Sequence, residues 1–513
     1  MSSPSPSPLV ALLGGQPDAP ALGAPGRVSR RYAELAALVA DAGACLARAG
    51  IGRGDTVAIV LPNGAVMASC FLAVAAHCTA APLNPAYREA EFEFYLDDLR
   101  PKALILPHGD ASPARAVATR LGILLLELTE DGEAPAGGFT LSVPAGALAV
   151  TATPPGTDDI ALVLHTSGTT SRPKIVPLSQ ANLCASARHI GATLALTPDD
   201  RCLNIMPLFH IHGLIAAVLS SLAAGAEVSC SPGFSATAFY GWLDEVAPTW
   251  YTAVPTMHQV ILDRAARNQA SVERARLRFV RSSSSSLPPA VMTRLEEVFR
   301  CPVLEAYGMT EATHQMTSNP LPPAARKPGA VGLPAGPEVR TLHVDGRFCT
   351  AGEEGEIVIR GPNVTAGYAN NPQANASAFA PDPDGGAPWF RTGDLGVFDD
   401  DGYLAISGRI KEIINRGGEK IAPREVDDVL TEHPDIAQAV TFAITHAKLG
   451  EDVAAAVVLR AGATLDERGL RDYAATRLAS FKVPAKVLFV EEIPKGATGK
   501  LTRIGLAKLL GLE

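Results

Sequence analysis

The chain has 513 residues, of which 47% are hydrophobic and 19% are charged. This length exceeds one hydrophobic core and predicts at least two domains, and the composition excludes a wholly disordered, collagen-like or coiled-coil protein. With 44 Lys and Arg against 53 Asp and Glu, the net charge is −9. Nucleic acid and anionic membranes are therefore not expected as partners.

Helical and strand patterns alternate through most of the chain and predict an α/β fold. Apolar residues at helical spacing predict helices over 30–49 and 65–76, and short apolar runs predict strands over 56–61 and 102–106. The apolar stretch 213–226 is too short for a bilayer span, which takes about 20 residues. We interpret it as a buried core helix.

Neither end of this sequence is expected to be a targeting signal. The start, MSSPSPSPLVALLGG, is rich in Ser and Pro and lacks the positive charge of a signal peptide. The final Gly-Leu-Glu is not a peroxisomal signal. A cytoplasmic protein is the expectation.

From residue 408 the pattern predicts a separate compact α/β unit of about a hundred residues, enough for its own small core. Pro423 suits the first position of a helix. The expected elements are helices over 423–430 and 466–478 and strands over 439–444, 453–459 and 487–490. The chain is thus divided into an N-terminal domain over 1–407, a hinge over 408–412 and a C-terminal domain over 413–513.

The strongest chemical signal is the segment 160–174, IALVLHTSGTTSRPK. An apolar strand leads into a loop of small residues, whose backbone N–H groups and hydroxyls can face an anion, and a lysine adds a positive charge. It is not a Walker A loop, because no Gly-Lys-Ser/Thr follows at the required spacing. The segment predicts phosphate binding by Thr166, Ser167, Gly168, Thr169, Thr170 and Lys174.

Together with four later motifs, this loop resembles the adenylate-forming superfamily, which includes acyl-CoA synthetases, luciferases and peptide-synthetase adenylation domains. The later motifs are YGMTE at 307–311, RTGD at 391–394, GRIKE at 408–412 and PKGATGK at 494–500. The resemblance covers the chain after its N-terminal leader. It implies an α/β fold with a large N-terminal domain of several subdomains and a small mobile C-terminal domain.

The resemblance also implies that a carboxylic acid is activated by ATP and Mg²⁺. Thr310 would contact the α-phosphate, and Tyr307 would stack on adenine. Glu311, with Thr170, would hold Mg²⁺, a hard cation that suits carboxylate and phosphate oxygens. Asp394 would bind the ribose hydroxyls with Arg409 beside it. The nucleotide site would be completed by Ser284, Ser285, Glu305, Ala306 and Gly308.

The remaining implied roles belong to the C-terminal domain. Lys500 would bridge the substrate carboxylate and the phosphate oxygens and stabilise the developing charge. Lys411 would be the hinge residue about which the small domain turns after adenylation. Gly417 and Gly418 would then line the thiol channel, since glycine permits close approach of the pantetheine arm of coenzyme A.

Histidine and serine side chains near the expected acyl pocket indicate a polar substrate. MPLFHIHG supplies His210 at the mouth of the acyl site, EATHQ supplies His314, and RSSSSSL supplies Ser284. A fatty acyl chain would leave such donors unpaired at a cost of about 1–3 kcal/mol each, whereas a second carboxylate would satisfy them. These segments resemble oxalate–CoA ligases and imply oxalate as the acid and coenzyme A as its acceptor.

Three other functions stay open on the sequence alone. One is CoA ligation of another acid, such as malonate, glycolate, or a medium-chain or fatty acid. Another is an adenylation enzyme that loads a separate carrier protein. The third is a non-catalytic nucleotide or acyl-adenylate sensor, which the presence of Glu311, Asp394, Lys411 and Lys500 disfavours. A monomer or homodimer is expected in each case.

Overall fold

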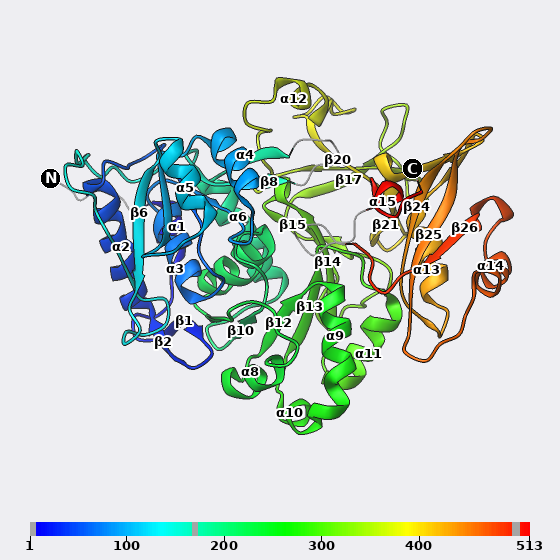
Figure 1. Cartoon of the computed structure of the whole chain (residues 1–513), viewed down its shortest axis with the longest axis horizontal. Coiled ribbons are helices and arrows are strands. Elements are labelled where there is room, and N and C mark those ends of the chain that lie inside the picture. Colours follow the sequence, from blue (N-terminus) through cyan, green and yellow to red (C-terminus); the bar gives the residue numbers. More distant parts are fainter. Residues whose placement is uncertain (1–6, 167–172, 495–502, 513) are drawn as a thin grey trace. The chain divides into compact units, whose positions relative to one another are not determined.

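The computed structural model describes residues 7–166, 173–494 and 503–512 (Figure 1). Their tertiary contacts form two compact units. Unit 1 comprises 7–166, 173–338 and 359–379, and unit 2 comprises 339–358, 380–494 and 503–512. Unit 2 takes in residues on both sides of 408–412, so the division at that predicted hinge stays a prediction.

One sheet of unit 1 is mainly parallel and has, among the described residues, seven strands in the order β7-β6-β5-β3-β4-β8-β9. Only its edge strands β7 and β9 run antiparallel to their neighbours. The bounds are β3 (Thr56–Ile59), β4 (Thr79–Pro82), β5 (Ala103–Pro107), β6 (Leu124–Glu130), β7 (Phe139–Leu141), β8 (Ile160–Thr166) and β9 (Lys174–Ser179). The predicted strands over 56–61 and 102–106 are confirmed as β3 and β5.

The second sheet of unit 1 carries most of the predicted site. In the described part of the chain its order is β16-β15-β14-β13-β12-β10-β11-β1-β2. Parallel pairing runs from β1 through β11, β10, β12 and β13 to β14, and β15 returns antiparallel beside β14. The bounds are β1 (Pro20–Ala24), β2 (Arg27–Arg31), β10 (Arg201–Asn204), β11 (Glu227–Cys230), β12 (Trp250–Ala253), β13 (Phe279–Ser283), β14 (Val303–Met309), β15 (His314–Ser318) and β16 (Leu333–Pro334).

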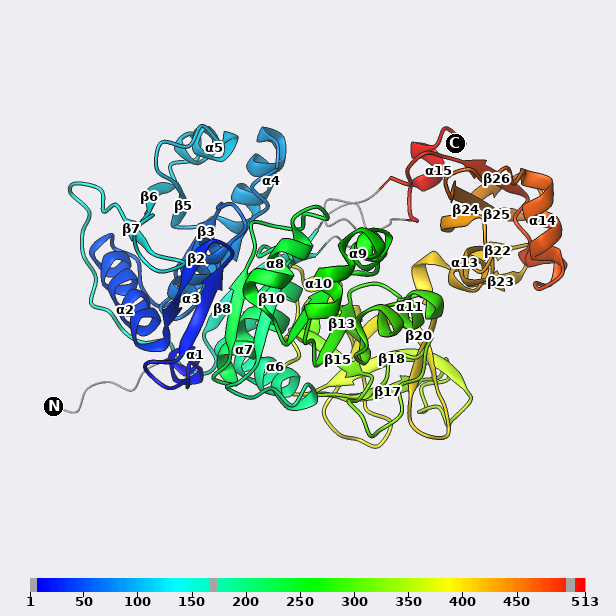
Figure 2. The ribbon, with the colours of Figure 1, turned by 90° about the horizontal axis from the view of Figure 1, so that it is seen from below.

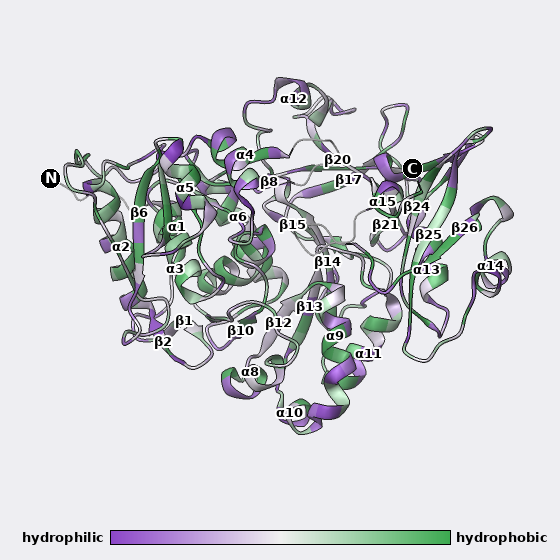
Figure 3. Cartoon of the chain, viewed as in Figure 1, coloured by the Kyte–Doolittle hydropathy of each residue, from purple (hydrophilic) through white to green (hydrophobic). Residues whose placement is uncertain are grey.

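Helices cover both faces of each sheet, because these strands are apolar on both sides. In β3, Val57 and Ile59 join the main hydrophobic core of unit 1. Ala58 in the same strand and Val60 directly after it pack into a second hydrophobic cluster on the other face. The main core unites both sheets with α1 (Pro8–Leu12), α2 (Tyr32–Arg48), α3 (Ala65–Ala75) and α6 (Gln180–Thr193). Figures 2 and 3 show α2 beside α3 and the hydrophobic colouring of this interior.

The other helices of unit 1 lie on the outer faces or at the edges. The seven-stranded sheet is covered by α4 (Glu89–Leu99) and α5 (Pro113–Arg120). The second sheet is covered by α8 (Phe239–Val246), α9 (Pro255–Ala265) and α11 (Pro289–Phe299). The shorter helices are η2 (Ala266–Asn268), α10 (Gln269–Arg274), η3 (Thr310–Ala312) and α12 (Pro372–Ala378). No helix within the described ranges has the length and apolar character needed to cross a membrane.

The predicted core helix over 213–226 is buried as expected, but its first part is a π-helix. The π-helix η1 (His212–Leu219) continues directly into the short helix α7 (Ser220–Ala223), and every residue of η1 is buried. A segment that is apolar on all sides carries no periodicity that distinguishes one helix type from another. Widened turns of this kind are frequent at functional sites, and η1 begins at a histidine.

Unit 2 contains two further sheets. The described strands of the first, β17 (Glu338–Leu342), β18 (Glu354–Arg360), β19 (Phe379–Ala380), β20 (Trp389–Phe398) and β21 (Leu404–Arg409), follow the order β17-β18-β20-β19, with β21 also paired to β20. Those of the second, β22 (Ile414–Arg416), β23 (Glu419–Ile421), β24 (Ile436–His446), β25 (Gly450–Leu459) and β26 (Lys486–Phe489), follow β23-β22-β25-β24, with β26 beside β25.

Helices complete the compact C-terminal part of unit 2. On one face of its second sheet, α13 (Pro423–Thr431) and α14 (Glu467–Ala475) share a core with β25, and α15 (Leu506–Leu509) covers the other face. Short helices η4 (Ile410–Glu412) and η5 (Ser480–Lys482) connect the elements. The two helices and three strands predicted here from the sequence are confirmed, and no end differs from its prediction by more than three residues.

Candidate active site

The hairpin of β14 and β15 carries the YGMTE motif on unit 1. Its register pairs Tyr307 with Thr317 and Gly308 with Gln315. A Cβ atom on Gly308 would lie 1.6 Å from the carbonyl oxygen of His314, so only glycine fits at this close approach. His314 itself has a positive φ of 97°, a strained conformation for a residue with a side chain. The turn thus has little freedom to rearrange.

Glu311 is buried in η3 and bonded to a tyrosine that lies outside the predicted motifs. The hydroxyl of Tyr368 donates to Glu311 Oε1 at 2.9 Å, and Lys174 Nζ lies 4.2 Å from the centroid of the Tyr368 ring. Burial and the Glu311 carboxylate raise the pKa of Tyr368, which keeps its hydroxyl protonated as a donor. Tyr368 therefore links the lysine of the phosphate loop to the carboxylate predicted to hold Mg²⁺.

The phosphate loop is held at its base by strand pairing. Thr166 at the end of β8 pairs with Lys174 at the start of β9, and the Thr166 hydroxyl approaches the Lys174 carbonyl oxygen at 3.5 Å. Four predicted members of the loop lie outside the described residues: Ser167, Gly168, Thr169 and Thr170.

Four polar side chains meet beside this hairpin, and we call His212, Thr252, Ser284 and His314 the polar cluster. His212 Nδ1 lies 3.0 Å from Ser284 Oγ, and its Nε2 lies 2.6 Å from Thr252 Oγ1. The imidazole rings of His212 and His314 stack with centroids 4.9 Å apart and planes inclined by 24°. The cluster brings two imidazoles and two hydroxyl groups together.

His212 shares the motif MPLFHIHG with His210, but only His210 has a predicted role there. His210 is half-buried, and its ring packs against Phe209 with centroids 4.6 Å apart. His212 is buried and begins η1. The motif MPLFHIHG contained both residues, but spacing alone does not tell which imidazole turns inward.

The serine loop after β13 is fixed by one backbone and one side-chain contact from β14. Ser283 Oγ donates to the Ala306 carbonyl oxygen at 2.8 Å, and Glu305 Oε1 accepts from the backbone N–H of Leu287 at 2.8 Å. Ser284 has a positive φ of 74°, and Ser285 is exposed. Glu305 and Ala306, both predicted at the nucleotide site, therefore also hold the two ends of this loop.

On unit 2, Asp394 and Arg409 form the pair expected from the ribose motif. They face each other across β20 and β21, and Arg409 Nε donates to Asp394 Oδ1 at 2.7 Å. Asp394 is buried and Arg409 is exposed. Lys411 is exposed in η4, and Lys500 lies outside the described residues.

Gly417 and Gly418 form the two-residue loop between β22 and β23, a hairpin that the sequence analysis did not predict. Their φ values are 60° and 98°. Positive φ at both positions is the geometry of a tight type I′ turn, which favours glycine. The turn geometry by itself accounts for two consecutive glycines at this point. The contact of Gly417 and Gly418 with coenzyme A stays a prediction.

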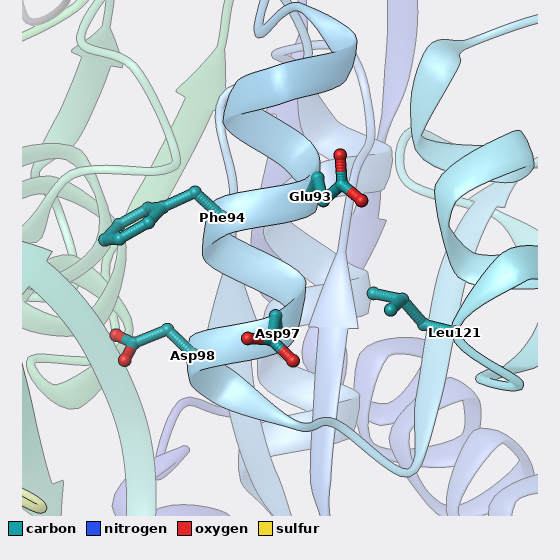
Figure 4. A pocket seen from close by; sticks show the side chains of 5 residues that line it. All are labelled: Glu93, Phe94, Asp97, Asp98 and Leu121. Atoms are coloured by element: carbon teal, nitrogen blue, oxygen red, sulfur yellow. The ribbon is translucent and has the colours of Figure 1, made fainter.

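A surface pocket on unit 1 is acidic and lies beside β8, the strand that leads into the phosphate loop (Figure 4). It is lined by Glu93, Phe94, Asp97, Asp98 and Leu121. Asp98 bonds to His165 Nε2 at 2.9 Å, and Glu93 pairs with Arg120 at 3.3 Å. Three carboxylates would repel a triphosphate, so this pocket is not a candidate nucleotide site.

Comparison with known proteins assigns the family. The model of the AMP-binding enzyme family matches residues 12–369, and the model of the AMP-binding enzyme C-terminal domain matches residues 425–500. The chain belongs to the AMP-binding enzyme family. This confirms the resemblance to the adenylate-forming superfamily and the predicted fold class.

Three individual proteins illustrate the similarity. The chain is 47% identical over 500 residues to oxalate–CoA ligase of Arabidopsis thaliana, covering 95% of both chains. It is 42% identical over 479 residues to oxalate–CoA ligase of Saccharomyces cerevisiae, covering 89% of this chain and 87% of the relative. It superposes on the crystal structure of ATP-bound MatB from Rhodopseudomonas palustris with a TM-score of 0.88 at 29% identity, covering 99% of both chains.

Proposed function

We propose that this protein ligates oxalate to coenzyme A in two steps. ATP and oxalate first form oxalyl-adenylate and pyrophosphate, and coenzyme A then displaces AMP to give oxalyl-CoA. The protein is an AMP-forming acid–CoA ligase. The observation that carries the choice of acid is the polar cluster, supported by the similarity to two oxalate–CoA ligases.

Oxalate suits the polar cluster because both ends of this acid are carboxylates. One carboxylate reacts with ATP, and the other accepts hydrogen bonds from Ser284 and from the imidazole of His314. An alkyl chain in the same place would bury these donors without partners, at a cost of about 1–3 kcal/mol each. His314, stacked on His212, and His210 at the mouth of the acyl site complete this substrate-binding set.

Adenylation joins two anions, so positioning and charge neutralisation dominate the chemistry. Glu311 presents a buried carboxylate, the type of oxygen ligand that Mg²⁺ accepts alongside phosphate oxygens, and thus fits this ion. Mg²⁺ neutralises phosphate charge when bound. Thr310 contacts the α-phosphate, Lys174 the outer phosphates, and Tyr307 the adenine ring. The phosphate-binding set further includes Thr166, Ser167, Gly168, Thr169 and Thr170.

In unit 2, Asp394 binds the ribose hydroxyls, and Arg409 orients its carboxylate through the 2.7 Å bond. Lys500 bridges oxalate and the α-phosphate in the first step. Lys411 is the hinge residue of the turn between the two steps, and Gly417 and Gly418 then admit the pantetheine arm. A cytoplasmic monomer or homodimer that binds neither membranes nor nucleic acid is proposed on composition and charge.

A screen of short acids tests the proposal. The purified chain with ATP, Mg²⁺ and coenzyme A is offered oxalate, malonate, glycolate, acetate and octanoate, and thioesters are detected by mass spectrometry. Oxalate should give the highest kcat/KM. Equal or better turnover of octanoate, or no thioester from any acid, would contradict the proposal.

Lys500→Ala separates the two steps. This variant should lose oxalate-dependent pyrophosphate exchange but still form the thioester from preformed oxalyl-adenylate, because the lysine is assigned to the first step alone. A sensor without catalysis would keep ligand binding unchanged in the variant and would show no pyrophosphate exchange even in the unaltered protein.

A further inference from the structure

A buried arginine, Arg281, lies directly behind the polar cluster. It is in the middle of β13, with 0% of its surface exposed. Its Nη1 lies 3.4 Å from His212 Nε2, and its Nη2 donates to Gln315 Oε1 at 3.2 Å. Among the described residues no carboxylate bonds to this guanidinium, and its Nε–H has no hydrogen-bond partner.

Gln315 is oriented so that it accepts from the arginine. Its amide nitrogen donates to the Ala335 carbonyl oxygen at 3.0 Å and approaches Thr193 Oγ1 at 3.1 Å. The side-chain oxygen is thereby directed at Arg281. The guanidinium is thus held in place by a neutral amide and by an imidazole.

The position of Arg281 dictates which nitrogen of His212 carries the proton. A guanidinium has only N–H donors, so the imidazole nitrogen facing it must accept, and Nε2 therefore bears no hydrogen. The hydroxyl of Thr252 donates to the same nitrogen. The ring proton then resides on Nδ1 and is donated to Ser284 Oγ at 3.0 Å.

This tautomer of His212 determines what the hydroxyl group of Ser284 can donate to. Since Ser284 Oγ already accepts from His212, its own O–H is free to donate to an anion. Ser284 is half-buried and makes no other hydrogen bond within the described part of the chain. Arg281, His212 and Ser284 thus form a relay in which every hydrogen bond points from the buried cation toward the acyl site.

The charge of Arg281 acts in the same direction as the relay. A cation in a low-dielectric interior that no carboxylate balances attracts an anion placed nearby more strongly than the same cation in water. Burial lowers the pKa of Arg281 to about 9, which leaves the group protonated at neutral pH. A substrate with a second carboxylate supplies the missing negative charge, whereas a monocarboxylate does not.

We propose that Arg281 is a positioning residue that selects dicarboxylate substrates, by fixing the His212 tautomer that turns Ser284 into a donor and by supplying uncompensated positive charge behind the acyl site. The inference rests on the proposed function, because it assigns the second carboxylate of oxalate to this cluster. Arg281 acts through His212 and does not itself touch the substrate.

The test compares Arg281→Met, which removes the donor and the charge at similar length, with Arg281→Lys, which keeps both. We expect Arg281→Met to lower kcat/KM for oxalate about 10- to 100-fold, the range that a hydrogen bond to a charged group supplies. The KM for ATP and the kcat/KM for glyoxylate, a monocarboxylate of similar size, should change less than threefold. Arg281→Lys should restore at least part of the activity with oxalate.

Arg278→Gln is the matched control on the same segment. Arg278 precedes β13 and pairs with the carboxylate of Asp200 at 2.9 Å, and its guanidinium bonds to Asp200 and to backbone carbonyl oxygens instead of the polar cluster. Its loss should leave the preference for oxalate over glyoxylate unchanged. A change in that preference as large as for Arg281→Met would overturn the inference.

The ring nitrogens of His212 give a readout that does not depend on turnover. With ¹⁵N-labelled histidine, and His212→Gln for assignment, the unaltered protein should show a protonated Nδ1 and an unprotonated Nε2. Arg281→Met should shift this tautomer balance and Arg281→Lys should preserve it.

An unaltered protein that turns over no oxalate refutes the proposed function. Oxalate turnover that survives Arg281→Met within threefold, or a protonated Nε2 in the unaltered protein, refutes the inference alone.

Discussion

Arg503 in unit 2 and Arg281 in unit 1 are both largely withdrawn from water, but they are held by different partners. Arg503 donates to Glu412 Oε2 through Nε at 3.1 Å and pairs with Asp427 Oδ2 at 2.5 Å. Arg281 contacts an imidazole and an amide. The charge of Arg503 is balanced by carboxylates of the protein itself. The charge of Arg281 has no such partner among the described residues and can act on a ligand.

The pKa values of the two arginines shift in opposite directions for this reason. Burial by itself would lower the pKa of Arg503, but Asp427 and Glu412 raise it. Burial lowers the pKa of Arg281 to about 9 without an opposing carboxylate contact among the described residues. Arg503, three residues after the PKGATGK motif in the sequence, bonds to Glu412 in η4, within the predicted hinge.

The largest expected effect is the loss of stability in Arg503→Met. The substitution leaves the Asp427 carboxylate buried without its cation, and breaking a buried pair in this way costs about 3–5 kcal/mol. Hydrogen exchange of the β24 amides, followed by mass spectrometry, should report the loss in unit 2. Arg468→Ala is the control, because the Arg468–Asp472 pair is exposed and should contribute less than about 1 kcal/mol.

A second substitution should partly repair the first. Adding Asp427→Asn to Arg503→Met removes the unbalanced carboxylate, so the double variant should be less destabilised than the sum of the single variants. The coupling free energy for such contacting residues is about 1–3 kcal/mol. Denaturant unfolding of all four proteins measures it, and strict additivity would show that the pair does not act as a unit.

Arg281→Met should destabilise unit 1 by only about 1 kcal/mol or less. The change strands no carboxylate, and replacing a buried charge by an apolar side chain of similar length is often neutral. Hydrogen exchange of the β13 amides checks this. A loss as large as that of Arg503→Met would mean that Arg281 serves the fold, and the contrast between the two arginines would disappear.

The smallest expected effect has the opposite sign. Ser284 adopts a left-handed φ of 74°, which glycine tolerates better than serine. Ser284→Gly should therefore raise the free energy of unfolding by about 0.5 kcal/mol while lowering oxalate turnover. Ser286→Gly, at a position without positive φ, should instead lose about 0.5–1 kcal/mol. Equal losses in both variants would indicate that Ser284 carries no strain.

Much of the fold was predictable because its elements have strong local periodicity. The helix expected over 30–49 is α2, and the helix expected over 65–76 is α3. The long hairpin of β20 and β21 was missed, since Asp394 was considered as part of a motif and not as part of a strand. The turn at Gly417 was missed because its strands are only three residues long.

Residues of the candidate site were predictable from the sequence only where they lie within a short motif of fixed spacing. Glu311, Asp394 and Arg409 were selected from such motifs, and the structure pairs the last two. Tyr368 lies 57 residues from Glu311 and outside every motif used. Its position beside Gly367 and near Asn371 and Pro372 signals a turn, but not a contact with a carboxylate.

The sequence by itself determined the family, the order of the α/β elements and the identity of the motif residues, because these depend on local periodicity and on short segments of fixed spacing. Only the tertiary structure decided that His212 is the inward histidine, that Tyr368 meets Glu311 and that Arg281 stands behind Ser284. His212 is 72 residues from Ser284, 40 from Thr252 and 69 from Arg281. Thr252 and Arg281 lie opposite each other on the parallel strands β12 and β13, and His212, at the start of η1, contacts both. No local pattern encodes these contacts.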